Sequence, residues 1–195
     1  MSKTIDFYYD YGSPAAFLAW TQIFDLADKH GATVVRKPAL LGGVFKNTGN
    51  SAPANVPAKG KYLFKDLGRY AKRYGVSFQF NENFPINTIY LMRGALHARR
   101  EGFLPEYDKA CFEAVWLNNK NMNDPAVVTQ VMTEAGFDAA AIGAAMQELS
   151  IKKELFEVTD EAVAAGLFGM PTFIIDGEMF WGQDRLDFVE EMIQG

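Results

Sequence analysis

Hydrophobic and polar residues alternate with a period of two near the start of the chain, and the pattern then changes to the period of a helix. Residues 4–10 alternate and are rich in Phe and Tyr, which predicts a strand. Residues 15–30 repeat apolar side chains three and four positions apart, which predicts an amphipathic helix. Residues 32–36 predict a second strand. A strand, a helix and a strand in this order favour a parallel pair with a right-handed crossover.

The alternation returns near the other end of the chain. Two apolar runs, residues 172–175 and 178–181, flank the dipeptide Asp176-Gly177. An Asp-Gly pair in this position predicts a β-hairpin, because both residues tolerate the positive φ of a tight turn. Residues 184–194 then predict a final helix. This end of the chain therefore has the order strand, strand, helix.

The middle of the chain has a helical period. Residues 40–43 and 47–51 are rich in Gly and Asn and predict turns. Residues 76–80 predict a short extended segment. Helices are expected over residues 61–74, 87–101, 105–118, 125–135, 138–149 and 150–165.

The combined order, β-α-β followed by β-β-α, is that of a thioredoxin fold. We therefore predict an α/β protein with a thioredoxin-like fold and a large all-helical insertion. The thioredoxin-like domain is expected to comprise residues 1–50 and 160–195, and the inserted helical domain residues 51–159. A plain doubly wound sheet is not expected, because it would need more parallel strands than the pattern offers.

Composition and charge narrow the classes of function. The 195 residues carry a formal net charge of -5, which argues against binding to a nucleic-acid backbone. No apolar run is long enough to span a membrane, and the first residues lack the pattern of a signal peptide, so we expect a cytoplasmic protein. The single cysteine, Cys111, excludes an internal disulfide and a Cys-x-x-Cys pair. The two histidines have no zinc-type spacing, so no metal site is expected.

The first candidate for chemistry is the strand-to-helix turn that contains Ser13 and Pro14. A helix N-terminus has unpaired N–H groups and a partial positive charge, which favour an anion such as a thiolate. A hydroxyl at this place can donate a hydrogen bond to that anion. By itself the pattern is explained better by Ser13 capping its helix and Pro14 occupying the first helical position, since Ser-Pro is common at a helix start.

Two further candidates lie near the other end of the chain. The Met170-Pro171 bond precedes a strand: a cis bond would turn the Met170 backbone toward a ligand, whereas base rates favour trans. Asp184 could bind an ammonium group, with the Gln183 side chain and nearby N–H groups binding a carboxylate. Asp184 is equally compatible with an N-cap supported by Asp187. The polar segment 46–50 reads, from its pattern alone, as a solvated turn.

The order of these motifs resembles a known family. Segments 7–14, 37–46 with 49–50, 168–173 and 180–186 resemble those of the 2-hydroxychromene-2-carboxylate isomerases and the kappa-class glutathione transferases. Both belong to the DsbA-like branch of the thioredoxin superfamily. Ala15 and Ala16 replace the aromatic residue that usually follows Ser-Pro, which leaves the shape of the substrate pocket open.

The resemblance implies glutathione as the cofactor and Ser13 as the residue in place of the reactive cysteine, in contact with the glutathione sulfur. It implies a cis Pro171, and backbone pairing of Met170 with the cysteinyl part of glutathione. The remaining residues would surround the ligand: Asp184, Arg185 and Gln183 at the γ-glutamyl end, Asn50 near the thiol, Lys46 near a carboxylate, and Trp181 as a wall.

The activity that this resemblance implies is cis–trans isomerisation of an aromatic 2-oxo acid in aromatic catabolism, through reversible addition of the glutathione thiol. A kappa-like transferase or peroxidase, acting on electrophiles or hydroperoxides, is the nearest alternative. A module that binds glutathione without chemistry also stays open, whereas disulfide exchange is disfavoured because Cys-x-x-Cys is missing. The family also implies a homodimer.

Overall fold

A four-stranded mixed sheet forms the centre of the computed structural model, which describes residues 2–195. Its strands are β1 (Thr4–Tyr9), β2 (Thr33–Pro38), β3 (Thr172–Ile175) and β4 (Glu178–Trp181), in the spatial order β2-β1-β3-β4. β1 and β2 are parallel, whereas β3 is antiparallel to both β1 and β4. The arrangement confirms the predicted β-α-β and β-β-α halves and the thioredoxin-like fold.

Alternation along β1 places one face of the strand in the core. Ile5, Phe7 and Tyr9 are fully buried. The Phe7 ring stacks on Phe173 of β3 with 5.3 Å between the ring centres. Burial of large aromatic side chains on one face fixes the register of the strand, because a shift by one residue would expose them all.

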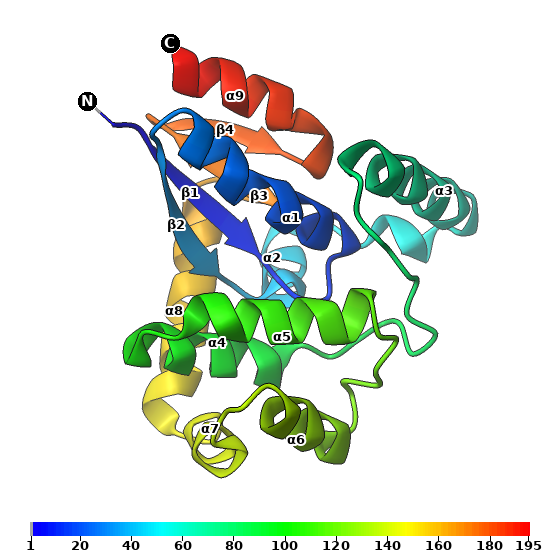
Figure 1. Ribbon diagram of the computed structural model, residues 1–195, viewed down its shortest axis with the longest axis vertical. Helices are drawn as coiled ribbons and strands as arrows, with labels where there is room; N and C mark the ends of the chain where they lie inside the picture. Colours follow the sequence, from blue (N-terminus) through cyan, green and yellow to red (C-terminus); the bar gives the residue numbers. More distant parts are fainter. Residues whose placement is uncertain (1) are drawn as a thin grey trace.

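Helices cover both faces of this sheet. α1 lies in front of the strands and α8 behind them (Figure 1). α9 packs against α1 and β3, and the group α4 to α7 lies at the opposite end of the molecule. The helices are α1 (Pro14–Lys29), α2 (Leu41–Thr48), α3 (Pro57–Tyr74), α4 (Ile89–Glu101), α5 (Leu104–Trp116), α6 (Pro125–Glu134), α7 (Ala139–Ala145), α8 (Leu149–Ala164) and α9 (Leu186–Gln194), with 3₁₀ turns η1 (Pro53–Asn55) and η2 (Gln183–Arg185).

One helix was not predicted. Residues 41–48 form α2, although their glycines indicated turns. α2 packs against α8. A Cβ atom at Gly43 would lie only 2.8 Å from the Thr159 Cγ2 atom, so glycine permits the two helices to approach closely. The tertiary contact outweighs the poor helix propensity of this segment.

Two details near the predicted elements also differ. Residues 76–80 pair with no strand in the part of the chain that the structure describes; instead the Gln79 N–H donates to the Trp116 carbonyl at 2.8 Å. The final α-helix begins at Leu186, and Arg185 precedes it. The interpretation of Asp184 as its N-cap is therefore wrong, because Asp184 lies within η2.

The predicted boundary between the two domains falls inside a helix. α8 runs without interruption through residues 159 and 160 and contacts both α2 and α4. α8 thus belongs to both parts, and the division into 1–50 with 160–195 and 51–159 stays a prediction. Across residues 2–195, every helix is too short or too polar to cross a lipid bilayer.

Candidate functional site

Ser13 lies where β1 passes into α1. Its backbone is extended (φ -95°, ψ 113°), and its Oγ accepts a hydrogen bond from the Ala16 N–H at 3.1 Å. The same hydroxyl donates to the Met170 carbonyl at 3.0 Å. Ser13 is only 4% exposed. Ser13 therefore caps α1, as predicted, and also connects α1 to the loop before β3.

Asp10 fixes the shape of the turn that carries Ser13. One carboxylate oxygen accepts from the Gly12 N–H at 2.8 Å and the other from the Leu41 N–H at 2.8 Å. Burial raises the pKa of Asp10, and the two backbone donors partly oppose this shift. Asp10 thereby joins the turn to the start of α2. Asp10 is not among the residues that the sequence predicts for the site, although an Asp two residues before Gly is typical of an Asx-turn.

A buried carboxylate on α5 supports the same turn from the helical side. The hydroxyls of Tyr9 and Tyr11 both donate to one oxygen of Asp108 at 2.7 Å. The Arg36 Nε atom lies 3.1 Å from the other oxygen, an ion pair without hydrogen-bond geometry. Burial raises the pKa of Asp108 to about 7, although the tyrosines and Arg36 lower it. Trp116 adds a bond from its indole N–H to the Tyr11 carbonyl at 2.8 Å.

The loop before β3 faces Ser13. Its Met170–Pro171 peptide bond is cis, as the family resemblance implied. Met170 is 5% exposed, and within residues 2–195 its N–H donates no hydrogen bond. The Asn50 side-chain amide donates to the Phe168 carbonyl at 2.8 Å, so the end of α2 is joined to this loop.

The segment that follows β4 is hydrogen-bonded to Pro171. The Gly182 N–H donates to the Pro171 carbonyl at 3.0 Å. The Trp181 ring, 45% exposed, packs on the Phe168 ring with 5.0 Å between centres. A Cβ atom at Gly169 would lie 2.6 Å from the Trp181 Nε1 atom, so a residue larger than glycine would displace this ring.

The polar residues that follow Trp181 form η2, which contacts α1. Asp184 and Arg185 form an ion pair, with 2.5 Å between Oδ2 and Nη1. Gln183 is 8% exposed, and its carbonyl accepts from the Tyr74 hydroxyl of α3. Burial raises the pKa of this tyrosine, so the hydroxyl stays protonated as a donor.

The structure thus connects most of the predicted site residues through a continuous set of contacts. The Ser13 hydroxyl bonds to Met170, and the Asn50 side chain bonds to Phe168 in the same loop before β3. Pro171, at the end of that loop, bonds to Gly182, which follows Trp181. Lys46 is different. It is exposed on the last turn of α2 and forms no ion pair in the described part of the chain.

The arrangement offers a hydroxyl and a helix N-terminus rather than a reactive thiol of its own. Cys111 is fully buried in α5, as the sequence analysis expected. Burial raises the pKa of its thiol well above the ordinary value, which disfavours the thiolate that attacks other sulfur compounds. No cluster of His, Cys, Asp and Glu suited to a metal ion occurs among residues 2–195.

Comparisons with known proteins agree with this fold. A family model described as DSBA-like thioredoxin domain matches residues 4–194. A 2-hydroxychromene-2-carboxylate isomerase of Sphingobium xenophagum is 30% identical over 195 residues, which cover 99% of each chain. Glutathione S-transferase kappa 1 of Homo sapiens is 23% identical over 99% of this chain and 92% of its own.

Solved structures lead to the same group. A structure of 2-hydroxychromene-2-carboxylate isomerase superposes with a TM-score of 0.88 at 28% identity, covering 98% of this chain and 94% of that one. The similarity extends over nearly the whole length, helical region included. The chain therefore belongs to the DsbA-like thioredoxin family and is a homologue of the 2-hydroxychromene-2-carboxylate isomerases and the kappa-class glutathione transferases.

Proposed function

We propose that this protein is a glutathione-dependent cis–trans isomerase of aromatic 2-oxo acids resembling 2-hydroxychromene-2-carboxylate. The observation that carries the proposal is the buried hydroxyl of Ser13 at the N-terminus of α1, facing Met170. This is the position where a thioredoxin-like enzyme needs its reactive sulfur, and the chain has no accessible cysteine there. A sulfur supplied by a cofactor would complete such a site. The isomerase relative at 30% identity supports this choice of reaction.

The residues around Ser13 fit a peptide thiol such as glutathione. Met170 is nearly buried, and its N–H, without an acceptor in residues 2–195, is free to pair with a peptide carbonyl. The N–H of Ala15, in the first turn of α1, likewise has no acceptor there. Ala15 follows Ser13 by two residues, and the Met170 carbonyl accepts the hydrogen bond of the Ser13 hydroxyl, so both N–H donors lie near that hydroxyl. The site therefore favours an anionic or carbonyl-bearing ligand.

Glutathione, when bound, supplies a nucleophilic thiol whose reversible addition frees rotation about a conjugated double bond. The role of the chain is to ionise and orient that thiol. The hydroxyl of Ser13 would exchange its bond to the Met170 carbonyl for one to the sulfur. The partial positive charge of the α1 N-terminus adds to this stabilisation of a thiolate.

Polar residues on both sides would orient the rest of the cofactor. Gln183, Asp184 and Arg185 would bind the γ-glutamyl end, where Asp184 can receive an ammonium group and Arg185 a carboxylate. Asn50 would lie near the thiol and Trp181 would form a wall. Lys46, which is exposed and forms no ion pair within residues 2–195, would attract a substrate or glycyl carboxylate.

The test is an assay of the purified protein with 2-hydroxychromene-2-carboxylate, with and without glutathione. Isomerisation that requires glutathione but does not consume it supports the proposal. Formation of a glutathione conjugate, or reduction of a hydroperoxide with oxidation of glutathione, would instead identify a kappa-like transferase or peroxidase. Failure to convert the compound with glutathione present contradicts the isomerase proposal. We further expect a cytoplasmic homodimer, which light scattering and cell fractionation would check.

A further inference from the structure

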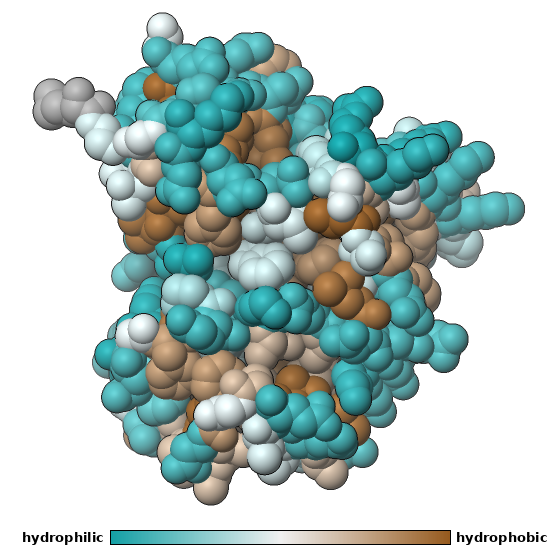
Figure 2. All heavy atoms as spheres, viewed as in Figure 1, coloured by the Kyte–Doolittle hydropathy of each residue, from teal (hydrophilic) through white to brown (hydrophobic). Residues whose placement is uncertain are grey.

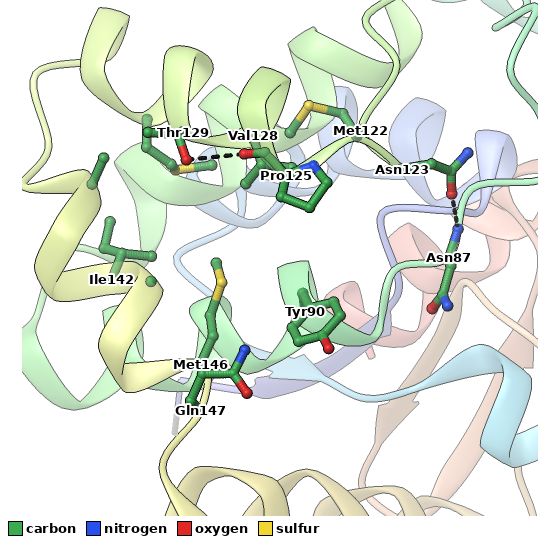
Figure 3. Close-up of a pocket in the computed structure, with 13 residues that line it drawn as sticks. Asn87, Tyr90, Met122, Asn123, Pro125, Val128, Thr129, Ile142, Met146 and Gln147 are labelled. Atoms are coloured by element: carbon green, nitrogen blue, oxygen red, sulfur yellow. Dashed lines mark hydrogen bonds between the residues drawn. The ribbon is translucent and has the colours of Figure 1, made fainter.

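A cavity of about 370 Å³ lies in the helical part of the molecule, between the start of α4 and the helices α6 and α7 (Figure 3). None of the residues assigned above to the Ser13 site lines it. Its volume is within the range of small-molecule sites, about 300–1,000 Å³. This cavity therefore needs an explanation of its own.

The lining of the cavity favours an uncharged aromatic ligand. Three methionines, Met122, Met132 and Met146, line it, and no charged side chain does. Methionine side chains adapt to a guest of irregular shape and make favourable contacts between sulfur and aromatic rings. Tyr90 supplies the one aromatic ring of the lining. The Arg93 guanidinium lies 5.3 Å from the centre of that ring without lining the cavity.

The polar side chains that line this cavity belong to Asn87, Tyr90, Asn123, Thr129 and Gln147. The side chains of Tyr90 and Gln147 line the cavity on the side across from α6 (Figure 3), and neither side chain makes a hydrogen bond within residues 2–195. Elsewhere in the lining, the Asn123 side-chain oxygen accepts from the Asn87 N–H at 2.8 Å and is already satisfied. A mostly apolar lining with a few polar groups is the usual pattern of a ligand site.

Figure 2 shows hydrophilic and apolar side chains intermixed over the part of the surface where Figure 1 places α5, α6 and α7. We propose that the cavity between α4, α6 and α7 is a second small-molecule site, which binds an uncharged aromatic compound with one hydrogen-bonding group.

Gly143 makes the proposal testable by substitution. It lies on α7, lines the cavity, and has open space within 4 Å of where a Cβ atom would stand. Gly143→Leu therefore adds a large side chain at the lining of the cavity, and no atom of the surrounding protein lies within 4 Å of the position of its Cβ atom. Gly143→Ala is the matched control, because a single methyl group makes the same backbone change and leaves most of the space. Neither variant touches the Ser13 site.

The probe is indole, an uncharged bicyclic compound with one N–H donor, and the readout is the NMR signals of [¹³C-methyl]methionine. The chain contains eight methionines, of which Met122, Met132 and Met146 line the cavity. We expect saturable shifts at these three signals in the full-length wild type and in Gly143→Ala, and at least a tenfold loss of affinity in Gly143→Leu. Indole-3-carboxylate should bind at least tenfold more weakly, because the cavity offers its charge no partner.

Other outcomes would overturn the proposal. These are the absence of shifts at the three methionines, shifts at Met170 instead, or equal binding by Gly143→Leu or by the charged probe. Gln147→Ala, at an exposed position, gives a second test if Gly143→Leu does not fold; the loss of one neutral hydrogen bond should weaken indole binding about fivefold. A dimer that dissociates in Gly143→Leu, with no indole binding in the wild type, would show that the cavity receives a second copy. The proposal is independent of the glutathione site, whose activity Gly143→Leu should leave unchanged.

Discussion

Removal of the Ser13 hydroxyl is the most direct test of the proposed site, because two contacts with known geometry depend on it. In Ser13→Ala, α1 loses a cap bond of 3.1 Å and the Met170 carbonyl loses a donor at 3.0 Å. The lost cap costs about 1 kcal/mol, and the lost donor costs about 1 kcal/mol more. We expect the free energy of unfolding to fall by about 2 kcal/mol and the Tm by roughly 4–8 °C.

The same variant should also change the ionisation of the thiol of bound glutathione. A hydrogen bond to a charged group is worth about 1.5–3 kcal/mol. Since one pKa unit corresponds to about 1.4 kcal/mol, the variant should raise the pKa of enzyme-bound glutathione by roughly one to two units. The assay is a titration of the ultraviolet thiolate absorbance of the complex. At neutral pH the rate of a thiolate-dependent reaction should fall by at least tenfold.

A control separates this effect from loss of stability. Asp138 caps α7 in the same way, accepting from the Ala141 N–H at 3.0 Å, and lies in the helical region. Asp138→Ala should cost a similar cap energy, about 1 kcal/mol, without changing the thiolate titration. If Ser13→Ala and the wild type titrate at the same pH, the role assigned to the hydroxyl is wrong.

Three further predictions concern the supports of the site. In Asp108→Asn the pH dependence of stability should change: the folded pKa of about 7 exceeds the ordinary 3.8, so this carboxyl destabilises the wild type increasingly as pH rises from about 4 to 7. Urea titrations should show the variant gaining on the order of 4 kcal/mol relative to the wild type across that window, and a difference independent of pH would contradict this. Gly43→Ala should lower the free energy of unfolding by about 1–3 kcal/mol, because the added Cβ atom would lie 2.8 Å from an atom of α8. Gly42→Ala, whose Cβ atom meets open space, should raise the free energy of unfolding by about 0.5–1 kcal/mol. Equal melting temperatures of the two variants would refute the packing argument. Asp10→Asn should cost about 1–3 kcal/mol and lower kcat/KM, since an amide cannot accept from both the turn and Leu41; wild-type values in denaturation and kinetics would refute it.

Local pattern predicted most of the elements because their physical signals are local. The strand alternation of β1 and the Asp176-Gly177 turn each specify a structure within a few residues. The turn has the positive φ values that the dipeptide favours, 51° at Asp176 and 84° at Gly177. α2 was missed because its helical state depends on Gly43 packing against α8, which lies more than 100 residues away.

The candidate site also has residues that the local sequence predicts and residues that it does not. The motifs at Ser13, Met170 and Asp184 could be found in the sequence because each adjoins the start of a helix or strand. The buried residues that support these motifs could not be found in the sequence. In the linear pattern Asp108 is an ordinary polar position of a helix, and only the fold brings the hydroxyls of Tyr9 and Tyr11 against it. A buried carboxylate has no signature in a linear pattern, since its partners come from distant strands.

The sequence by itself determined the β-α-β and β-β-α order at the two ends of the chain, the absence of a reactive cysteine pair and the cap at Ser13, because these follow from neighbouring residues. Only the tertiary structure decided which distant groups meet: that the Ser13 hydroxyl reaches Met170, that Asp10 holds the start of α2, and that three methionines of the helical region surround a cavity. Contacts between segments far apart in the chain depend on how helices and strands pack, and packing is a property of the whole molecule rather than of any one segment.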